Sequence, residues 1–459
     1  MEEKVEQSRM GTVPVNKLMM GMGIPIILSM MLQAFYNIVD SAFVSNMAEY
    51  GEEALNALTL AFPVQLLIVA VGVGTGVGTN ALASKALGQK DFEKANRVAG
   101  NACFVTFLIY IFWILFGIFG VEWYIGTQTS NEVIYGMAVS YLRICCVISF
   151  GMVYFSVFEK LLQSTGRSVY STIAQVLGAG TNIVLDPILI YGLGFFPQMG
   201  VRGAAVATVI GQIVSFAAAF LFHLKFDKEF QSVFRYLKPV PKIIGEIYAI
   251  GLPAIIAQAL MSIMTYGLNR ILVIIGENMV TAYGLYYKIQ QFILFAAFGL
   301  RDTITPVVSF SHGMRNRERI QEGMKYGIIY TLVIMIAGTV ILELLAVPLC
   351  GVFGISGETQ ALCVAAMRII SISFVFAGSS IAFQGIFQAI DGGFQSLIIS
   401  VCRQLIFVLP VAWLFVRMIV AGNMAASAVW WTFPIAEVIT TVIGIFLLRG
   451  SYKKKVAVL

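Results

Sequence analysis

The sequence predicts an all-α polytopic membrane protein, with about twelve transmembrane helices in two pseudo-symmetric lobes of six helices each. The chain of 459 residues is 59% hydrophobic and only 12% charged, too few charges to cover the surface of a soluble domain of this length. Its apolar stretches are long and unbroken, and they lack the two-residue alternation of a β-barrel strand. Its two halves also share sequence landmarks at separations close to half the chain length.

A span that crosses the bilayer as a helix needs about 20 apolar residues. By this measure the predicted spans are 16–46, 54–84, 95–119, 131–157, 162–190, 202–224, 243–275, 279–310, 321–346, 358–384, 395–419 and 425–449. Lipid offers no partner for backbone polar groups, so each span must satisfy its own hydrogen bonds as a helix. We expect an N-lobe over residues 1–224, a cytoplasmic linker over 225–242 and a C-lobe over 243–459.

The loop charges predict the orientation of the chain. If the N-terminus is cytoplasmic, the loops on its side carry clusters of basic residues, among them Lys85, Lys90, Lys160, Arg167, Arg315 and Arg317. The opposite loops carry acids and almost no Lys or Arg, which is the pattern of the positive-inside rule. The sequence therefore predicts a multi-pass protein of the cell membrane with both termini in the cytoplasm. Because the +6 net charge is spread over short loops, we expect no nucleic-acid partner.

The chain contains an internal repeat of about half its length. Gly23-Ile-Pro begins the first span, and Gly251-Leu-Pro begins the seventh, 228 residues later. The stretch Leu87–Asp91 after the second span corresponds to His312–Asn316 after the eighth. Both halves begin on the same side, so the repeats are parallel and related by an axis along the membrane normal. Such halves suit alternating access around a central cavity, although a channel or a membrane enzyme can also be duplicated.

Five stretches follow one another in a characteristic order: Phe35–Val44, Gly72–Gly78, Ala83–Asp91, Leu161–Gly166 and Asn182–Pro187. In their order and spacing the chain resembles the multidrug and toxic compound extrusion (MATE) family over nearly its whole length. Within that family it is most similar to the bacterial DinF-like and MepA-like branch. The resemblance implies two six-helix lobes in a V, which export bulky and often cationic organic compounds against an inward flow of H⁺ or Na⁺.

Two acids inside predicted spans are candidates for coupling. Acids within a membrane are costly, and they are retained for function or in structural pairs. Asp40 and Asp186 each lie roughly 30–35 Å along their helices from the cytoplasmic landmarks Lys17 and Arg167, so they share a depth in the outer half. Two carboxylates facing each other there would share protons or hold a small cation, because adjacent negative charges raise one another's proton affinity. Alternatively, each is a buried structural acceptor for a neighbouring helix.

The neighbours of these acids add polar groups on the same helix faces. Asn182 precedes Asp186 by four residues, and Tyr36 and Asn37 stand in a similar relation to Asp40, the spacing that places side chains on one face. The family resemblance implies that Asp40, Asn182 and Asp186 form the core of a first-lobe site for H⁺ or Na⁺.

Pro187 follows the second acid directly. It has no N–H, so it leaves the carbonyl of Ile183 without its helical partner. That oxygen is a candidate ligand for a hard cation, or the place where the helix bends on protonation; a simple kink is the alternative. Tyr141 and Thr208 are further candidates through the resemblance.

The second half of the chain differs from the NorM-like branch of the same family in its acidic residues. The NorM-like branch has a Glu eight residues past the proline of the seventh helix, where this chain has Met261, and the stretch Phe374–Ala382 contains no acid. We therefore expect coupling in the first lobe and no cation site in the second. The other charges in or near the spans are interpreted as structural: Glu343, Glu437, Arg143, Arg301, Asp302, Arg368 and Arg403.

The predicted function is a secondary active multidrug exporter that moves lipophilic and cationic organic compounds outward against H⁺ or Na⁺, with no cofactor besides that ion. The alternative is a lipid-linked precursor flippase or a metabolite exporter of the same superfamily. A flippase would need a strongly cationic cavity, and the inner helices are poor in Lys and Arg. An enzyme would need a nucleophile–base pair or a His/Cys/Asp cluster at one depth, and none is evident. We expect six free core thiols, and a monomer in contact with membrane lipid.

Overall fold

Helices form nearly the whole chain in the computed structural model, which describes residues 9–47, 50–194, 196–231, 233–352 and 357–459. The first half holds α2 (Arg9–Thr12), α3 (Val15–Ser45), α4 (Gly51–Gly88), α5 (Phe92–Leu115), the π-helical turn η1 (Phe116–Gly120), α6 (Val121–Gly126), α7 (Glu132–Val147), α8 (Phe150–Ser164), α9 (Ser168–Tyr191) and α10 (Val201–Phe226). The short helix η2 (Val233–Tyr236) precedes the second half, which holds α11 (Pro241–Leu272), α12 (Glu277–Gly313), α13 (Arg317–Val352), α14 (Gly357–Ser371), α15 (Phe374–Ala389), α16 (Gly393–Val401), the π-helical turn η3 (Cys402–Ile406), α17 (Val408–Val420), the short helix η4 (Ala426–Trp431) and α18 (Thr432–Lys455).

The predicted fold class is confirmed. Among the described residues, ten helices are long and apolar enough to cross a membrane, and two bent pairs bring the number to as many as twelve. The pairs are α7 with α8, bent by 45°, and α14 with α15, bent by 53°, so the same position in each half contains the bend. The predicted fourth span, 131–157, is too short, because α8 continues the apolar run to Ser164. All six cysteines are buried and free, as expected.

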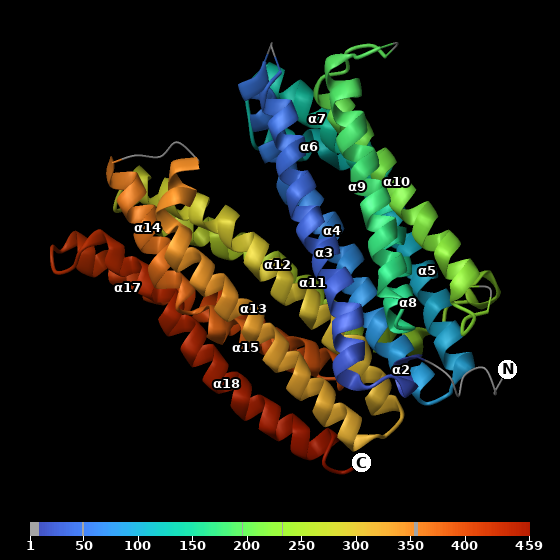
Figure 1. Ribbon diagram of the computed structural model, residues 1–459. Coiled ribbons are helices and arrows are strands. Elements are labelled where there is room, and N and C mark those ends of the chain that lie inside the picture. The colour runs from blue at the N-terminus through green and yellow to red at the C-terminus, as the bar shows by residue number, and fades with distance from the viewer. Residues whose placement is uncertain (1–8, 48–49, 195, 232, 353–356) are drawn as a thin grey trace.

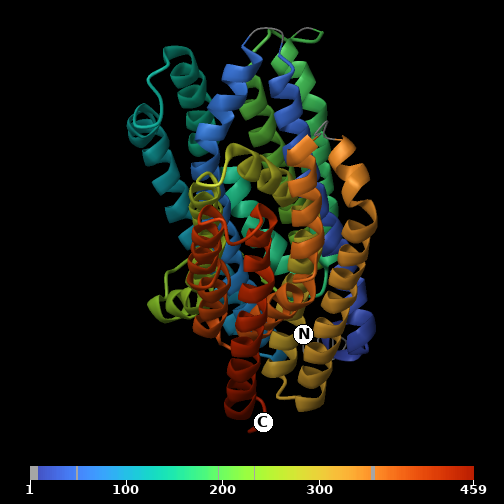
Figure 2. The same ribbon diagram turned by 90° about the vertical axis from the view of Figure 1, so that its left-hand side faces the viewer.

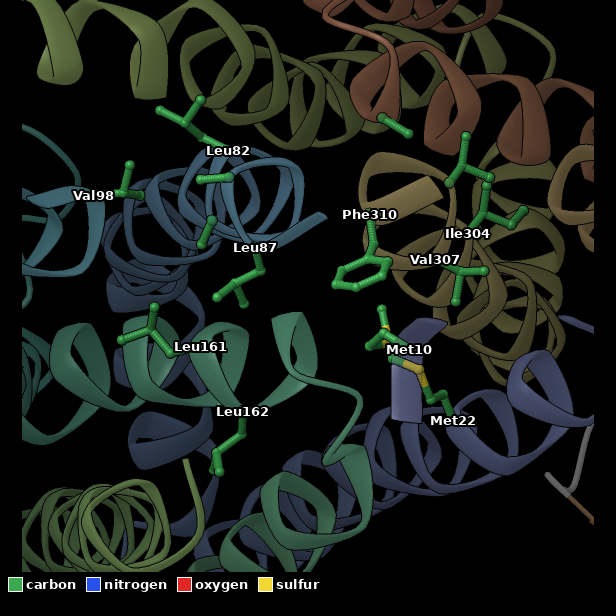
Figure 3. Packing of buried hydrophobic residues seen from close by; sticks show 14 of the residues in the cluster. Met10, Met22, Leu82, Leu87, Val98, Leu161, Leu162, Ile304, Val307 and Phe310 are labelled. Carbon is green, nitrogen blue, oxygen red and sulfur yellow. The ribbon is translucent and has the colours of Figure 1, made fainter. Parts of the chain in front are cut away.

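The two halves form two bundles that meet at one end and diverge toward the other (Figure 1). The buried clusters follow this shape. One apolar cluster lies within the first half and another within the second, whereas the largest combines side chains of both halves. In that shared cluster, Phe310 of α12 lies beside Met10, with Leu87 of α4 close by (Figure 3). Helix α18 descends to the C-terminus at this joined end (Figure 2), so the molecule is held together near its termini.

Reciprocal contacts between α4 and α12 show that the halves pack symmetrically. A Cβ atom on Gly88 would lie 2.1 Å from the carbonyl oxygen of Phe310, and one on Gly313 would lie 2.1 Å from that of Lys85. Gly88 and Gly313 are 225 positions apart, as are Lys85 and Phe310. Each helix therefore presents a glycine to the backbone of the other, an approach that any side chain would prevent.

The turns that follow repeat the same geometry. Lys90 and Arg315, again 225 positions apart, have positive φ angles of 58° and 56°. Gly166 and Asp391 form a second pair at the same separation, with φ angles of 80° and 58°. Because positive φ is uncommon outside glycine, its recurrence at matched positions confirms that the sequence repeat is also a structural repeat.

The segment between the halves is fastened to the first one. The backbone N–H groups of Gln231 and Val240 donate to the side chains of Asn96 and Asn101 on α5, each at 2.6 Å. Arg167, before α9, forms an ion pair of 2.8 Å with Glu229. These contacts hold the connection against the first bundle; the predicted division at residues 225 and 242 stays a prediction.

Candidate functional site

Two helices of the first half bring the predicted coupling residues together. Asp40 lies near the end of α3, and Asn182 and Asp186 lie one turn apart on α9. All three are buried: the exposed fractions are 9%, 3% and 0%. The amide of Asn182 donates to Asp186 Oδ1 at 3.3 Å. Asp40 lies close enough to Asp186 for its charge to act on that carboxyl group, so the two predicted acids share one site.

The most informative feature of this site is a set of oxygens without donors. Asp40 Oδ1, Asp186 Oδ2, Asn182 Oδ1 and Thr208 Oγ1 are buried, and none has a hydrogen-bond partner among the described residues. Buried polar atoms are bonded in the great majority of cases, because an unmade bond costs about 1–3 kcal/mol. Four acceptors of this kind contributed by α3, α9 and α10 are suited to a group that brings positive charge or a proton, as hard cations prefer oxygen ligands.

Two tyrosines border the acids, and one of them is fixed by a residue that the sequence analysis missed. Tyr141 on α7 is 2% exposed, and Gln65 of α4 donates to its hydroxyl at 3.0 Å. The charges of both acids act on Tyr141, and that of Asp40 acts on Tyr36. Only the spatial fold reveals Gln65, because 76 residues separate it from Tyr141.

Two further predicted residues are Pro187 and Asn37. Pro187 lies inside α9, which continues as one helix to Tyr191. The side chain of Asn37 lies outside the part of the chain that the structure describes, so its predicted role stays untested.

A pocket adjoins this site. Tyr36, Asn182 and Thr208 contribute to its wall, together with polar side chains of α3, α8 and α9 and the apolar Met30, Met152 and Phe155. The same pocket reaches Glu159, Lys160 and Asp302. It therefore connects the predicted coupling residues with a second group of charges, in which a residue of the other half takes part.

This second group corrects one prediction. Lys160 was expected in a cytoplasmic loop, but it lies on α8, with 2% of its side chain exposed. It forms an ion pair of 2.6 Å with Asp302 of α12, which also accepts from the guanidinium group of Arg301 at 2.8 Å. A lysine can be buried there because a buried carboxylate of the other half neutralises it. Its partner is 142 residues away, so the sequence pattern around Lys160 could not indicate this position.

Glu159 belongs to the same cluster. Its carboxylate accepts from the amide of Gln163 at 3.0 Å, and Lys160 donates to the carbonyl oxygen of that amide, also at 3.0 Å. Two acids and two basic residues thus share one buried network at the junction of the halves.

Comparisons with known proteins agree with this architecture. A family model described as MatE matches residues 25–188 and 253–414, one match in each half. The multidrug export protein MepA of Staphylococcus saprophyticus is 24% identical over 438 residues, covering 95% of this chain and 94% of that protein. The MepA protein of Staphylococcus aureus strain MSSA476 is 25% identical over 442 residues, with the same coverage of both chains.

Solved structures are similar over almost the entire chain. One is a multidrug resistance MATE family transporter of the MOP superfamily in its outward-facing conformation, with a TM-score of 0.90 and 26% identity over 97% of this chain and 98% of that one. Another is a MOP superfamily transporter from Pyrococcus furiosus whose binding pocket of reversed polarity was taken to suggest a different function. It has a TM-score of 0.89 and 27% identity over 98% of both chains.

Proposed function

Because the chain belongs to the MatE family, we propose that it is a multidrug exporter of the cell membrane. In this proposal it is a secondary active antiporter, which moves lipophilic and cationic organic compounds outward against an inward flow of H⁺ or Na⁺. The names of its relatives and the pocket beside the paired acids support this proposal. No chemical step on the substrate is part of it, and the protein acts as a monomer with both termini in the cytoplasm.

The observation that carries the proposal is the set of four buried acceptor oxygens beside the pocket. A proton on one of the carboxyl groups would give Asp40 and Asp186 a donor to share. A sodium ion would be held by the carboxylates, with Asn182 and Thr208 as candidate neutral ligands. Either ion removes negative charge beside the pocket, which weakens the attraction for a bound organic cation.

The shape of the molecule supports alternating access. The bundles diverge at the end opposite the termini (Figure 1), which faces outward if the basic loops mark the cytoplasmic side. Binding of the ion in this state would favour release of the compound outside. A difference of a few kcal/mol in ion affinity between the two states is enough to shift such an equilibrium.

The flippase alternative requires a strongly cationic cavity for a diphosphate. Lys160 lines the pocket and Arg301 adjoins it, but Asp302 and Glu159 balance their two positive charges. This balance favours organic cations over diphosphates as the cargo.

The proposal is tested by ethidium efflux in inverted membrane vesicles, with H⁺ and Na⁺ gradients imposed separately. We expect wild-type protein to move the dye under only one gradient, and Asp40→Asn to lose most of that activity at equal expression. Glu93→Gln is the matched control, because this acid pairs with Arg97 on the exposed surface, one turn away on α5.

Each result has a defined meaning. Dye movement that ignores both gradients contradicts ion-coupled export. Normal efflux by Asp40→Asn contradicts the site, even if the exporter function stands. Equal losses in Asp40→Asn and Glu93→Gln would show that the assay reports general damage to the protein.

A further inference from the structure

A second pocket lies within the other half of the molecule. Its apolar walls include Met261 of α11, Phe298 of α12 and Phe374 of α15. Its polar walls include Arg403 and Gln404 of η3 and Glu437 of α18. Pockets that bind organic molecules commonly combine apolar and aromatic walls with a few polar groups. The pocket thus has the composition of a solute site, although none of the predicted coupling residues takes part in it.

The charged groups of this pocket are only partly paired. Arg403 Nε donates to Glu437 Oε1 at 2.5 Å, and the two side chains are 10% and 8% exposed. The other carboxylate oxygen, Oε2, and Gln404 Oε1 are buried without a hydrogen-bond partner in the described part of the chain. Both residues are more than nine-tenths buried, with exposed fractions of 6% and 7%. Within the same described residues, the terminal nitrogens of Arg403 donate no hydrogen bond.

The backbone explains why the arginine lies inside the bundle. Arg403 and Gln404 belong to the π-helical turn η3, which interrupts the helical run from α16 to α17. A π-helical turn inserts an extra residue and rotates the side chains that follow, and such turns are frequent at functional sites. Removing either charge would leave the other unpaired in a low-dielectric interior. The π-helical turn therefore supplies the arginine, and the buried ion pair with Glu437 keeps its charge balanced within this lobe.

The free groups define the chemistry of a ligand. The terminal nitrogens of Arg403 can donate to an acceptor, whereas Glu437 Oε2 and Gln404 Oε1 are buried and lack donors among the described residues. A simple cation would satisfy the carboxylate but would face the positive guanidinium group at the same time. A zwitterion satisfies both, because its anionic group pairs with the arginine and its cationic N–H group with the acceptors.

We propose that this C-lobe pocket binds amphipathic zwitterions, with the anionic group on Arg403, the cationic group on Glu437 and Gln404, and the apolar body against Met261, Phe298 and Phe374. The inference adds a substrate class to the proposed function. Its importance for transport rests on that proposed function. It gives the exporter two solute sites of different selectivity, one beside the acids of the N-lobe for cations and one in the C-lobe for zwitterions.

The test is binding to the purified full-length protein in detergent, followed by fluorescence anisotropy. The two probes are the rhodamine that carries two free amino groups and a free carboxylate, and its methyl ester, which is a plain cation with the same body. The double variant Arg403→Gln/Glu437→Gln keeps two neutral amides in place of the ion pair. We expect it to weaken binding of the zwitterion about tenfold or more and to change binding of the ester less than about twofold.

Two further variants make the test independent of folding. Gln404→Leu removes an acceptor that has no partner, so it leaves the fold stable, and we expect it to weaken binding of the zwitterion alone. Glu343→Gln/Arg368→Gln is the matched control, since this pair lies 4.0 Å apart with side chains 41% and 53% exposed, outside the pocket. It should bind both probes as the wild type does.

Three results would overturn the proposal. One is unchanged binding of the zwitterion in Gln404→Leu, whatever the double variant does. Another is an equal loss of both probes in a correctly folded double variant. The third is a double variant that changes the pH dependence of efflux but binds the zwitterion as tightly as the wild type does. That result would make Glu437 a proton carrier instead of a ligand-binding residue. Because binding needs no gradient, failure of ion-coupled efflux would leave this result standing.

Discussion

Asn182 shows how much of the first-lobe site depends on one side chain. Its amide nitrogen donates to Asp186 Oδ1, while its amide oxygen is one of the four acceptors without a donor. The residue thus fixes the orientation of a carboxylate and also offers a ligand of its own. A hydrogen bond to a charged group contributes about 1.5–3 kcal/mol, so its loss should be visible in the affinity for the coupling ion.

If Na⁺ is the coupling ion, we expect Asn182→Ala to raise the concentration required for half-maximal efflux by about tenfold, because the ion loses a neutral ligand. If H⁺ is the coupling ion, the required concentration should fall instead, because the Asp186 carboxylate loses a donor that stabilises its charged form. The measurement is dye efflux at a series of ion gradients. Thr181→Ala is the control, because this hydroxyl bonds only to the backbone oxygen of Leu177 within its own helix. An unchanged ion dependence in Asn182→Ala would separate this residue from ion binding.

At this scale the sequence predicted residues within one helix better than partners across the fold. Asn182 and Asp186 were found because a separation of four residues places them on one face. The pairing of Lys160 with Asp302 was missed, because a basic residue at the end of an apolar run is typical of a cytoplasmic loop. Arg403 and Glu437 were interpreted as structural, since nothing in the sequence marks the π-helical turn that brings them into a pocket.

Among the helices, the α4–α11 contact depends on backbone approach. A Cβ atom on Gly78 of α4 would lie 2.1 Å from the carbonyl oxygen of Ile247 on α11. Gly74 and Gly251 approach each other in the same seam, where a Cβ on Gly74 would lie 2.9 Å from the carbonyl oxygen of Gly251. Two glycines of the Gly72–Gly78 run thus allow close packing of the helices.

Gly78→Ala should destabilise the protein by about 1–3 kcal/mol, the usual cost of overpacking, because a backbone atom cannot turn aside as a side chain can. The measurement is thermal unfolding in detergent. Gly245→Ala, on α11 itself, is the matched control, since no heavy atom lies within 4 Å of its added Cβ. We expect this control to be neutral or slightly stabilising. Equal melting temperatures for both variants would contradict the close packing.

Element boundaries were predictable where apolar runs end at charges or glycines, and less so at the bends. The breaks between α7 and α8 and between α14 and α15 fall inside apolar sequence, where hydropathy gives no signal. The repeat was visible because its glycines are required by the backbone contacts between the halves. For the same reason, the twofold arrangement of the lobes was predictable, whereas the side-chain pairs along their junction were not.

For the molecule as a whole, Asp302 links the two halves. It pairs with Lys160 of the first half and Arg301 of the second, and its own side chain is 1% exposed. Asp302→Asn removes the ion-pair partner of two basic groups and leaves only Glu159 in the network to balance them, so we expect a loss of about 3–5 kcal/mol. Lys160→Met should cost less, because Asp302 retains Arg301.

The predicted order of stability is thus wild type, then Lys160→Met, then Asp302→Asn, measured by thermal unfolding of the purified protein. Lys94→Met is the control, since its ion pair with Glu246 also joins the halves at 2.7 Å but is about one-third exposed on both sides, and such pairs contribute about 0–1 kcal/mol. A Lys160→Met variant less stable than Asp302→Asn would show that the lysine, not the aspartate, holds the junction.

The seam of Gly74, Gly78 and Gly251 lies in the inner half of the very long helix α4, and this has a mechanical consequence. Helix α4 has 38 residues, so it measures about 57 Å at a rise of about 1.5 Å per residue. The part of α4 from Gly78 outward to Gly51 measures about 40 Å. A rotation of about 15° about the seam, of the size seen for rigid-body rotations in other proteins, would displace the outer end by about 10 Å. Contacts at the seam would shift far less, because they lie near the pivot. In the proposed alternating access the helix would thus work as a lever, in which ångström adjustments around a few glycines would open or close a passage at the opposite face of the membrane.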